Sequence, residues 1–275
     1  MPGTIIDAPA HQPLTGKVAL VTGADRNLGK SMALSMLNAG ACVAMTAMYG
    51  SFLAQVVEES GAEDRILALE ADISKEEDRG KLLSQTFERF GKIDILVNNA
   101  AVTPETFWPN WASDGEPRQW TLDADFYRMF LEIDTVAPHV FMAAVIPQMI
   151  ERGWGRIVNI STSLETMLLF WPYESAKAAL EAQTAVLATQ LGGSGVTANI
   201  LGPGAFVKPA PVVLPNGGVV EPQHGPEIME APMLWLASDE ANRVNGKRIS
   251  AAAWHNASES GDPRLEAVAP IGWTC

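Results

Sequence analysis

Cysteine and long apolar runs are both scarce in this sequence. The 275 residues include two cysteines, Cys42 inside an apolar run and Cys275 at the last position. This pair does not make a disulfide framework, so we expect a reducing, cytoplasmic environment. No run of about 18 apolar residues occurs, and residues 1–17 lack a basic segment followed by a long apolar one. We therefore expect neither a membrane span nor a secretory signal.

Basic residues are also few. Nineteen Lys and Arg face 32 Asp and Glu, which gives a formal net charge of -13. Such a surface repels a phosphate backbone and argues against nucleic acid as a partner. The histidines, His11, His139, His224 and His255, are scattered without metal-ligand spacing, so no metal site is expected. A small anion remains possible, because helix N-termini and local arginines can bind phosphate.

Short β-rich runs alternate with longer helix-like stretches along the chain. The alternation predicts an α/β fold: a single-domain, Rossmann-like, doubly wound parallel sheet with helices on both faces. We expect one domain over residues 1–275, with its core at about 15–253. The predicted strands are 17–23, 42–47, 65–72, 93–100, 156–161, 196–204 and 247–253.

Three segments do not follow this alternation. Residues 101–125 are an aromatic insertion with three tryptophans and a phenylalanine, and residues 202–226 are rich in proline. Long irregular segments in compact domains often carry function, although ordinary surface loops or subunit contacts would look the same. Residues 254–275 are expected to form a tail that packs on a neighbouring subunit.

A glycine-containing turn, TGADRNLG at residues 22–29, directly follows the first predicted strand and precedes a helix. Backbone N–H groups and the helix dipole can meet a pyrophosphate at such a turn. The spacing alone is weak, because any strand-to-helix turn can contain glycine. The strand–turn–helix setting favours a dinucleotide site.

Tyr173 and Lys177 lie four residues apart on a predicted helix, so both side chains share one face. A free tyrosine has a pKa of about 10 and is a poor base near neutrality. A nearby cation favours the phenolate and lowers that pKa. The spacing therefore suits proton transfer with an alcohol or a ketone, although it also occurs by chance on solvated helix faces.

These motifs occur in a fixed order with several companions. Asp72 ends the third predicted strand, Asn98–Ala100 follows the fourth, a hydroxyl cluster at 161–163 follows the fifth, and Pro203–Gly204 follows the sixth. In this order the sequence resembles the classical short-chain dehydrogenase/reductase family, from about Lys17 to Ala253. The resemblance implies an NAD(P)-dependent oxidoreductase that interconverts a secondary alcohol and a ketone.

The resemblance also assigns roles to individual residues. Tyr173 would be the general acid/base, and Lys177 would hold the nicotinamide ribose and lower the pKa of the tyrosine. Other residues would bind the phosphates and adenosine ribose (Gly23, Arg26, Asn27, Leu28, Gly29), the adenine (Asp72, Ile73), the ribose floor (Asn99, Ala100, Ala101) and the nicotinamide (Pro203, Gly204, Ala205, Phe206).

Four positions depart from the family pattern. Asn27 replaces the usual second glycine and Ala101 the usual last glycine after Asn98–Ala100. Asp134 stands where the family's catalytic tetrad has Asn, and we expect it to keep a structural or relay role. Lys208 replaces the usual Thr after Pro203–Gly204. The substrate-orienting hydroxyl is either Thr162 or Ser163.

The cofactor and the activity leave alternatives open. No acid ends the second predicted strand, and Arg26 suits a 2′-phosphate, so NADP is favoured over NAD. A 3-oxoacyl thioester reductase and a non-catalytic NAD(P)-sensing protein are the alternatives to an alcohol/ketone oxidoreductase. Small residues on the helix after Tyr173 would allow close packing between subunits, and the family implies a homodimer or homotetramer. The substrate is a small molecule of unknown identity.

Overall fold

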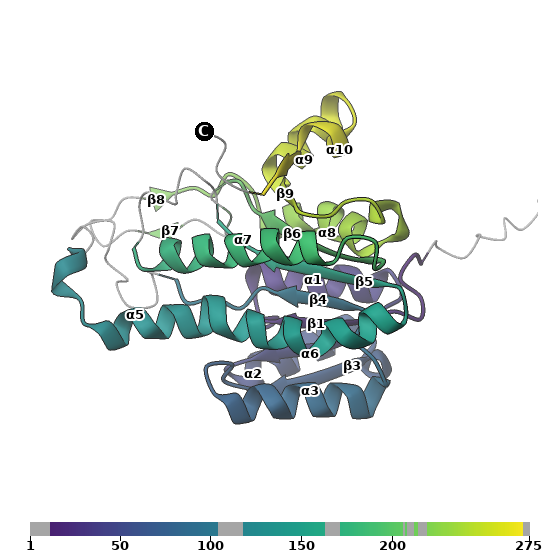
Figure 1. Cartoon of the computed structure of the whole chain (residues 1–275), viewed down its shortest axis with the longest axis horizontal. Helices are drawn as coiled ribbons and strands as arrows, with labels where there is room; N and C mark the ends of the chain where they lie inside the picture. Colours follow the sequence, from purple (N-terminus) through teal and green to yellow (C-terminus); the bar gives the residue numbers. More distant parts are fainter. Residues whose placement is uncertain are drawn as a thin grey trace, which may run out of the picture.

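One eight-stranded sheet organises the protein. The computed structural model describes residues 12–103, 118–162, 171–205, 207, 212–213 and 219–271. The strands lie in the order β10-β9-β6-β5-β4-β1-β2-β3, all neighbours being parallel except β10 and β9 (Figure 1). This confirms the predicted doubly wound α/β fold. The strands are β1 (Val18–Thr22), β2 (Cys42–Ala47), β3 (Ile66–Glu70), β4 (Ile95–Asn98), β5 (Gly155–Ile160), β6 (Val196–Gly202), β9 (Lys247–Ser250) and β10 (Val268–Pro270), with a separate pair β7 (Val212–Val213) and β8 (Val219–Val220).

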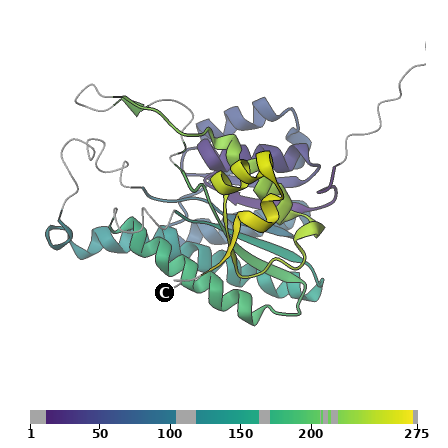
Figure 2. The ribbon, with the colours of Figure 1, turned by 90° about the horizontal axis from the view of Figure 1, so that it is seen from above.

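The central strands are apolar because both of their faces are covered. Every residue of β1, β4, β5 and β6 is buried. Helices α1 (Asn27–Asn38), α2 (Gly50–Ser60) and α8 (Glu230–Ala237) pack on one face, and α3 (Glu76–Phe90), α6 (Ala137–Glu151) and α7 (Tyr173–Gln190) on the other. The two groups lie on opposite sides of the sheet in Figure 2.

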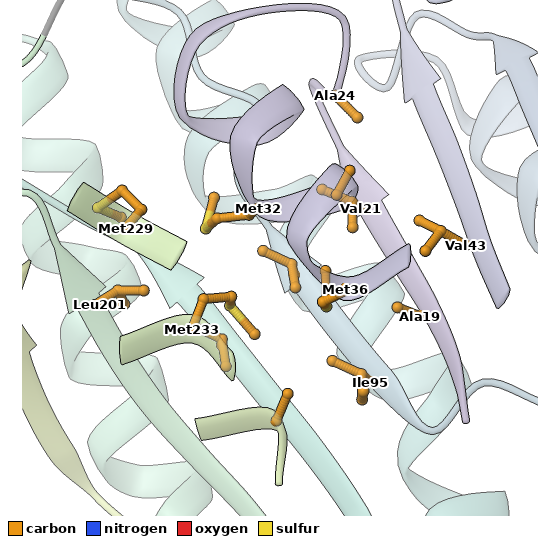
Figure 3. Packing of buried hydrophobic residues seen from close by; sticks show 14 of the residues in the cluster. Ala19, Val21, Ala24, Met32, Met36, Val43, Ile95, Leu201, Met229 and Met233 are labelled. Atoms are coloured by element: carbon orange, nitrogen blue, oxygen red, sulfur yellow. The ribbon is translucent and has the colours of Figure 1, made fainter. Parts of the chain in front are cut away.

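Each face has its own buried cluster. On the α1 face, methionines from α1 and α8 fill the space above β1, β4 and β6 (Figure 3). Methionine suits this layer because its unbranched side chain fills irregular gaps. The cluster in Figure 3 includes Ala19, Val21, Ala24, Met32, Met36, Val43, Ile95, Leu201, Met229 and Met233.

The longest helix runs from Ala124 to Glu151 and consists of α5 (Ala124–Leu131), a π-helical turn (Glu132–Val136) and α6. By length and composition alone it could cross a membrane, and 44% of its most apolar window is buried inside the protein. Phe141, Val145 and Met149 are fully buried on the sheet, as in the core helix of a globular domain. The absence of a membrane span therefore stays a prediction.

The end of the chain differs from its prediction. Residues 247–253 were expected to be one strand and 254–275 a tail, yet β9 ends at Ser250. The Ser250 hydroxyl accepts from Ala253 N (3.2 Å) and caps α9 (Ala251–Ser260), which the alanine-rich sequence favours. After α10 (Pro263–Glu266), β10 pairs antiparallel with β9. The expected tail thus contributes an eighth strand, and the sheet is mixed at this edge.

Candidate functional site

The turn after β1 brings the start of α1 to the carboxyl edge of the sheet. Gly23 has φ +64°, and Asn27, the first residue of α1, has φ +45°. Asn27 is the one non-glycine residue with positive φ in the described part of the chain. The family's second glycine is thus replaced by one of the few residue types that tolerate this conformation.

The first turn of α1 is available to an anion. Its N-terminus has no side-chain cap and no acidic residue in the first turn. The N–H groups of a first helical turn lack partners within the helix, and the helix dipole favours a negative charge there. Arg26 precedes the helix with 67% of its side chain exposed and only a 3.6 Å contact to Asp25 Oδ2. These groups fit a phosphate.

Asn99 joins this turn to the end of β4. Its Nδ2 donates to the carbonyls of Thr22 and Gly23 (2.9 Å each), and Thr22 Oγ1 accepts from the N–H groups of Asn99 and Ala100 (3.0 Å each). A Cβ on Gly29 would lie 2.0 Å from Gly23 O, so there is no room for a side chain. The predicted phosphate and ribose residues therefore form one tightly packed unit, with Leu28 partly buried beside it and Ala101 exposed.

The predicted adenine residues lie after β3. The Asp72 carboxylate accepts from Ser74 N (3.0 Å) and Ser74 Oγ (2.7 Å), and Lys75 Nζ lies 3.4 Å away. Partial burial opposes ionisation, but these hydrogen bonds and the ammonium outweigh it and hold the pKa of Asp72 below its usual value. Ile73 is buried in the core. Asp72 therefore supports its own loop and Ile73 belongs to the core, and the adenine role of both stays a prediction.

Lys177 lies fully inside the protein, one helical turn after Tyr173. Its Nζ donates to Ile160 O at the end of β5 (3.1 Å) and lies 5.4 Å from the centre of the Tyr173 ring. The same nitrogen is 3.0 Å from Oδ1 of Asp134, an ion pair rather than a well-aligned hydrogen bond. The sequence-predicted group Tyr173, Lys177 and Asp134 is thus brought together.

Asp134 has no exposed surface. Its Oδ2 accepts from Val102 N (3.2 Å), so it also holds the chain leaving β4. Burial raises the pKa of this carboxyl, whereas the Lys177 ammonium and the Val102 N–H act in the opposite direction. The expected structural role of Asp134 is consistent with these contacts.

A π-helical turn (Glu132–Val136), which was not predicted from the sequence, positions Asp134. Ala137 N bonds to Glu132 O, five residues back, and Pro138 follows. A proline inside a helix has no N–H for the carbonyl four residues earlier, here Asp134, and its ring presses on that carbonyl. The wider turn relieves this conflict, and such turns are frequent at functional sites. Pro138 was the signal in the sequence.

The hydroxyl cluster after β5 divides into separate roles. Ser161 donates to Glu181 Oε1 (2.5 Å), whereas Thr162 Oγ1 contacts Glu174 Oε1 at the longer distance of 3.4 Å. Ser163 lies outside the described residues, so the choice between Thr162 and Ser163 stays open. Buried Glu174 and Glu181 were not predicted, although both acids stand in an otherwise alanine-rich helix seven residues apart.

The loop after β6 is packed against the start of α9. Pro203 O accepts from Ala252 N (3.0 Å), and Gly204 has φ +68°. A Cβ on Gly204 would lie 2.1 Å from Ser250 Oγ. Ala205 packs against the core, and Phe206 and Lys208 lie outside the described residues. The nicotinamide roles of this loop stay predictions.

Two of the four histidines, which are far apart in the sequence, lie side by side in the structure. His224 and His255 stack edge to face with centroids 5.1 Å apart. Within the described ranges, no three His, Cys, Asp or Glu side chains form a group that could hold a metal ion.

Comparison with known proteins identifies the family. The profile described as short chain dehydrogenase matches residues 17–211. The chain belongs to the short-chain dehydrogenase family. It is 31% identical to a short-chain type dehydrogenase/reductase of Picea abies over 86% of this chain and 91% of the relative. It is 32% identical to a 3-oxoacyl-(acyl-carrier-protein) reductase of Pseudomonas aeruginosa over 70% of this chain and 74% of that protein.

A solved structure has the same fold. The metagenomic short-chain oxidoreductase in complex with NADP aligns with a TM-score of 0.70 and 23% identity, over 86% of this chain and 97% of that chain. The family profile and the two relatives, rather than this structural likeness, make the protein an oxidoreductase of the short-chain dehydrogenase family.

The left-handed conformation of Asn27 predicts opposite effects for two substitutions. Asn27→Ala should lower the free energy of unfolding by about 1 kcal/mol, because a Cβ without a polar side chain is disfavoured at positive φ. Asn27→Gly should equal or exceed the wild type, since glycine adopts this conformation without steric cost. Urea unfolding measures both. Equal stability of the two variants would contradict the assigned conformation.

Proposed function

We propose that this protein interconverts a secondary alcohol and a ketone with a nicotinamide cofactor, with Tyr173 as the general acid/base. The observation that carries the proposal is the buried Lys177 ammonium, 5.4 Å from the Tyr173 ring and held by Ile160 O and Asp134. An ammonium fixed in this position favours the phenolate.

The cofactor supplies or accepts the hydride when it is bound. Tyr173 then gives the phenolic proton to the oxygen that becomes the alcohol, or takes it back in oxidation. Lys177 stabilises the phenolate that remains. Thr162 or Ser163 orients the substrate oxygen, and Thr162 is buried at the end of β5 close to this helix.

NADP is the proposed cofactor. The uncapped start of α1 and the exposed Arg26 offer donors and positive charge for phosphate groups. The oxidoreductase of similar fold was solved with NADP, which supports the same choice.

One observation favours NAD as a second candidate. Glu70 ends β3 opposite Ala47 at the end of β2, and its Oε2 accepts from Gly50 N (2.9 Å) at the start of α2. A carboxylate in this region suits a ribose hydroxyl and opposes a 2′-phosphate. In this alternative, Glu70 of β3 would take the place of the acid that β2 lacks.

Two other functions are the alternatives. The Pseudomonas aeruginosa relative is a 3-oxoacyl-(acyl-carrier-protein) reductase, which supports a thioester substrate. The net charge of -13 counts against an acidic carrier protein or a coenzyme A phosphate. A non-catalytic NAD(P)-sensing protein would have no use for the combination of Tyr173 with Lys177.

Assembly and location belong to the same proposal. A homodimer or homotetramer built on α7 is supported by the small residues Ala178, Ala179 and Ala182, which are partly or fully exposed on that helix together with Val186. Light scattering after size-exclusion chromatography measures the assembly. A cytoplasmic location is supported by Cys42, a free cysteine, and cell fractionation tests it.

Replacing the tyrosine hydroxyl tests the proposed chemistry. The wild type should oxidise NADPH with at least one of three ketones: acetophenone, ethyl acetoacetate or the N-acetylcysteamine thioester of acetoacetate. Tyr173→Phe should lose turnover by about 100-fold or more, because it cannot transfer the proton, while NADPH fluorescence still reports binding. Tyr127→Phe, on α5, is the matched control and should keep its turnover. Equal turnover of Tyr173→Phe and wild type would overturn the proposal.

Removal of the charge at Arg26 tests cofactor choice. Arg26→Gln should raise KM for NADPH by about tenfold and leave KM for NADH nearly unchanged, because only NADPH carries the 2′-phosphate. Arg128→Gln, another exposed arginine on α5, should change neither. If Glu70→Gln rather than Arg26→Gln changes the NADPH to NADH ratio, the Glu70 alternative is favoured.

The pH dependence of alcohol oxidation tests Asp134. A carboxylate at Asp134 would counteract the effect of the Lys177 ammonium on the tyrosine. Asp134→Asn removes this charge, so the rate should rise with pH at lower pH values than in the wild type. Glu132→Gln removes a charge from the same turn, where Glu132 pairs with Arg79, and should leave the profile unchanged. Identical profiles for Asp134→Asn and wild type would contradict the role of the ion pair.

A further inference from the structure

A second, largely buried ion pair lies next to Ser161 and Thr162, the first two residues of the loop after β5. Arg248 on β9 donates to Glu181 Oε1 on α7, and the two side chains are only 13% and 9% exposed. The two residues are 67 positions apart in the sequence. Neither has a role in the predicted site.

The pair holds both residues at the start of that loop. Arg248 Nη2 donates to the carbonyl of Thr162, while Glu181 Oε1 accepts from Ser161 Oγ (2.5 Å). One partner therefore fixes the backbone beside the substrate-orienting hydroxyl, and the other fixes the preceding side chain. The guanidinium can make both of its bonds because its donors are held in one rigid plane.

The position of Arg248 links two loops of the site. Arg248 pairs in register with Ile200 of β6, and two residues later Ser250 pairs with Gly202. Ala252 then bonds to Pro203 O, in the loop after β6. The β9–α9 junction thus contacts the loops after β5 and β6 together.

The Glu181–Arg248 ion pair is not explained by a contribution to the stability of the fold alone. The desolvation of two buried charges offsets most of their attraction, so an apolar pair of similar size is often equally stable. A charged pair fixes geometry, however, because its hydrogen bonds are directional.

We propose that Glu181 and Arg248 are positioning residues that hold Ser161 and Thr162, the first two residues after β5, so that the substrate-orienting hydroxyl there meets the substrate oxygen. This inference rests on the proposed function for its kinetic consequence. Its structural consequence, a fixed Ser161–Thr162 backbone, can be measured without any substrate.

Two variants test the proposal. Arg248→Lys keeps the charge but cannot reproduce the planar bonds to both acceptors. Glu181→Gln/Arg248→Met removes both charges of this pair and retains an amide oxygen that can accept from Ser161. With the ketone that the wild type reduces fastest, kcat should fall by about 10- to 100-fold in both variants, since a displacement of about 1 Å can have that effect. The Kd for NADPH should stay within about twofold of the wild-type value.

The matched control is Arg156→Lys. Arg156 is another buried arginine, on β5 itself but at the opposite end of the sheet, where it bonds to Ser238 O and Asn242 Oδ1. Arg156→Lys and Arg248→Lys should both lose stability, but only Arg156→Lys should keep its kcat. A fall in kcat in both lysine variants, in proportion to lost stability, would overturn the positioning role.

Hydrogen exchange supplies the second readout. Ser161 N donates to Leu201 O (3.1 Å). The Ser161 amide should exchange faster in Glu181→Gln/Arg248→Met, and by a larger factor than the amides of β4. In Arg156→Lys its exchange should rise by no more than that of the β4 amides, because a loss of global stability affects both alike. Unchanged exchange, or a folded double variant with kcat within about twofold of wild type, would overturn the proposal. If the wild type reduces no ketone, the proposed function fails, and the exchange result still decides whether the pair holds the loop.

Discussion

The burial of one ammonium group determines how the candidate site is assembled. Lys177 is inside the protein, and a buried charge needs fixed partners. Those partners come from the end of β5 through Ile160 O and from the long helix through Asp134, which also holds the chain after β4. The end of β5, the long helix and α7 thus meet at the Lys177 ammonium. Tyr173 lies on α7, the helix that carries Lys177.

The sequence predicted the fold well where the signals were local and strong. Apolar runs located all seven parallel strands to within a few residues, and the order of short motifs located the candidate site at their carboxyl ends. The largest difference was the end of the run KRISAAA, whose last three alanines belong to α9, because alanine fits either a buried strand or a helix. The chain forms a helix here because the Ser250 hydroxyl accepts from Ala253 N and caps α9. This hydrogen bond depends on the backbone conformation of Ser250 and not on the composition of the run.

Other parts of the site depend on contacts that spacing cannot predict. The choice of Arg248 as the partner of Glu181 follows from the neighbouring positions of β6 and β9, and nothing in either local sequence indicates it. Glu70 lies beside the end of β2 because β3 pairs with β2 in the register that sets Glu70 opposite Ala47, and neither strand sequence indicates that register. Asn27 was different: its tolerance of positive φ is a property of the residue type, and the structure confirms that this property is used.

The last strand has a consequence for behaviour in solution. β10 is three residues long, ends at Pro270 and covers β9, which would otherwise be an open edge. A short strand that ends in a residue without an N–H is a poor template for another β-strand. Edge-to-edge association and the aggregation that follows from it are therefore disfavoured on this side of the sheet, because the chain covers β9 with its own final strand.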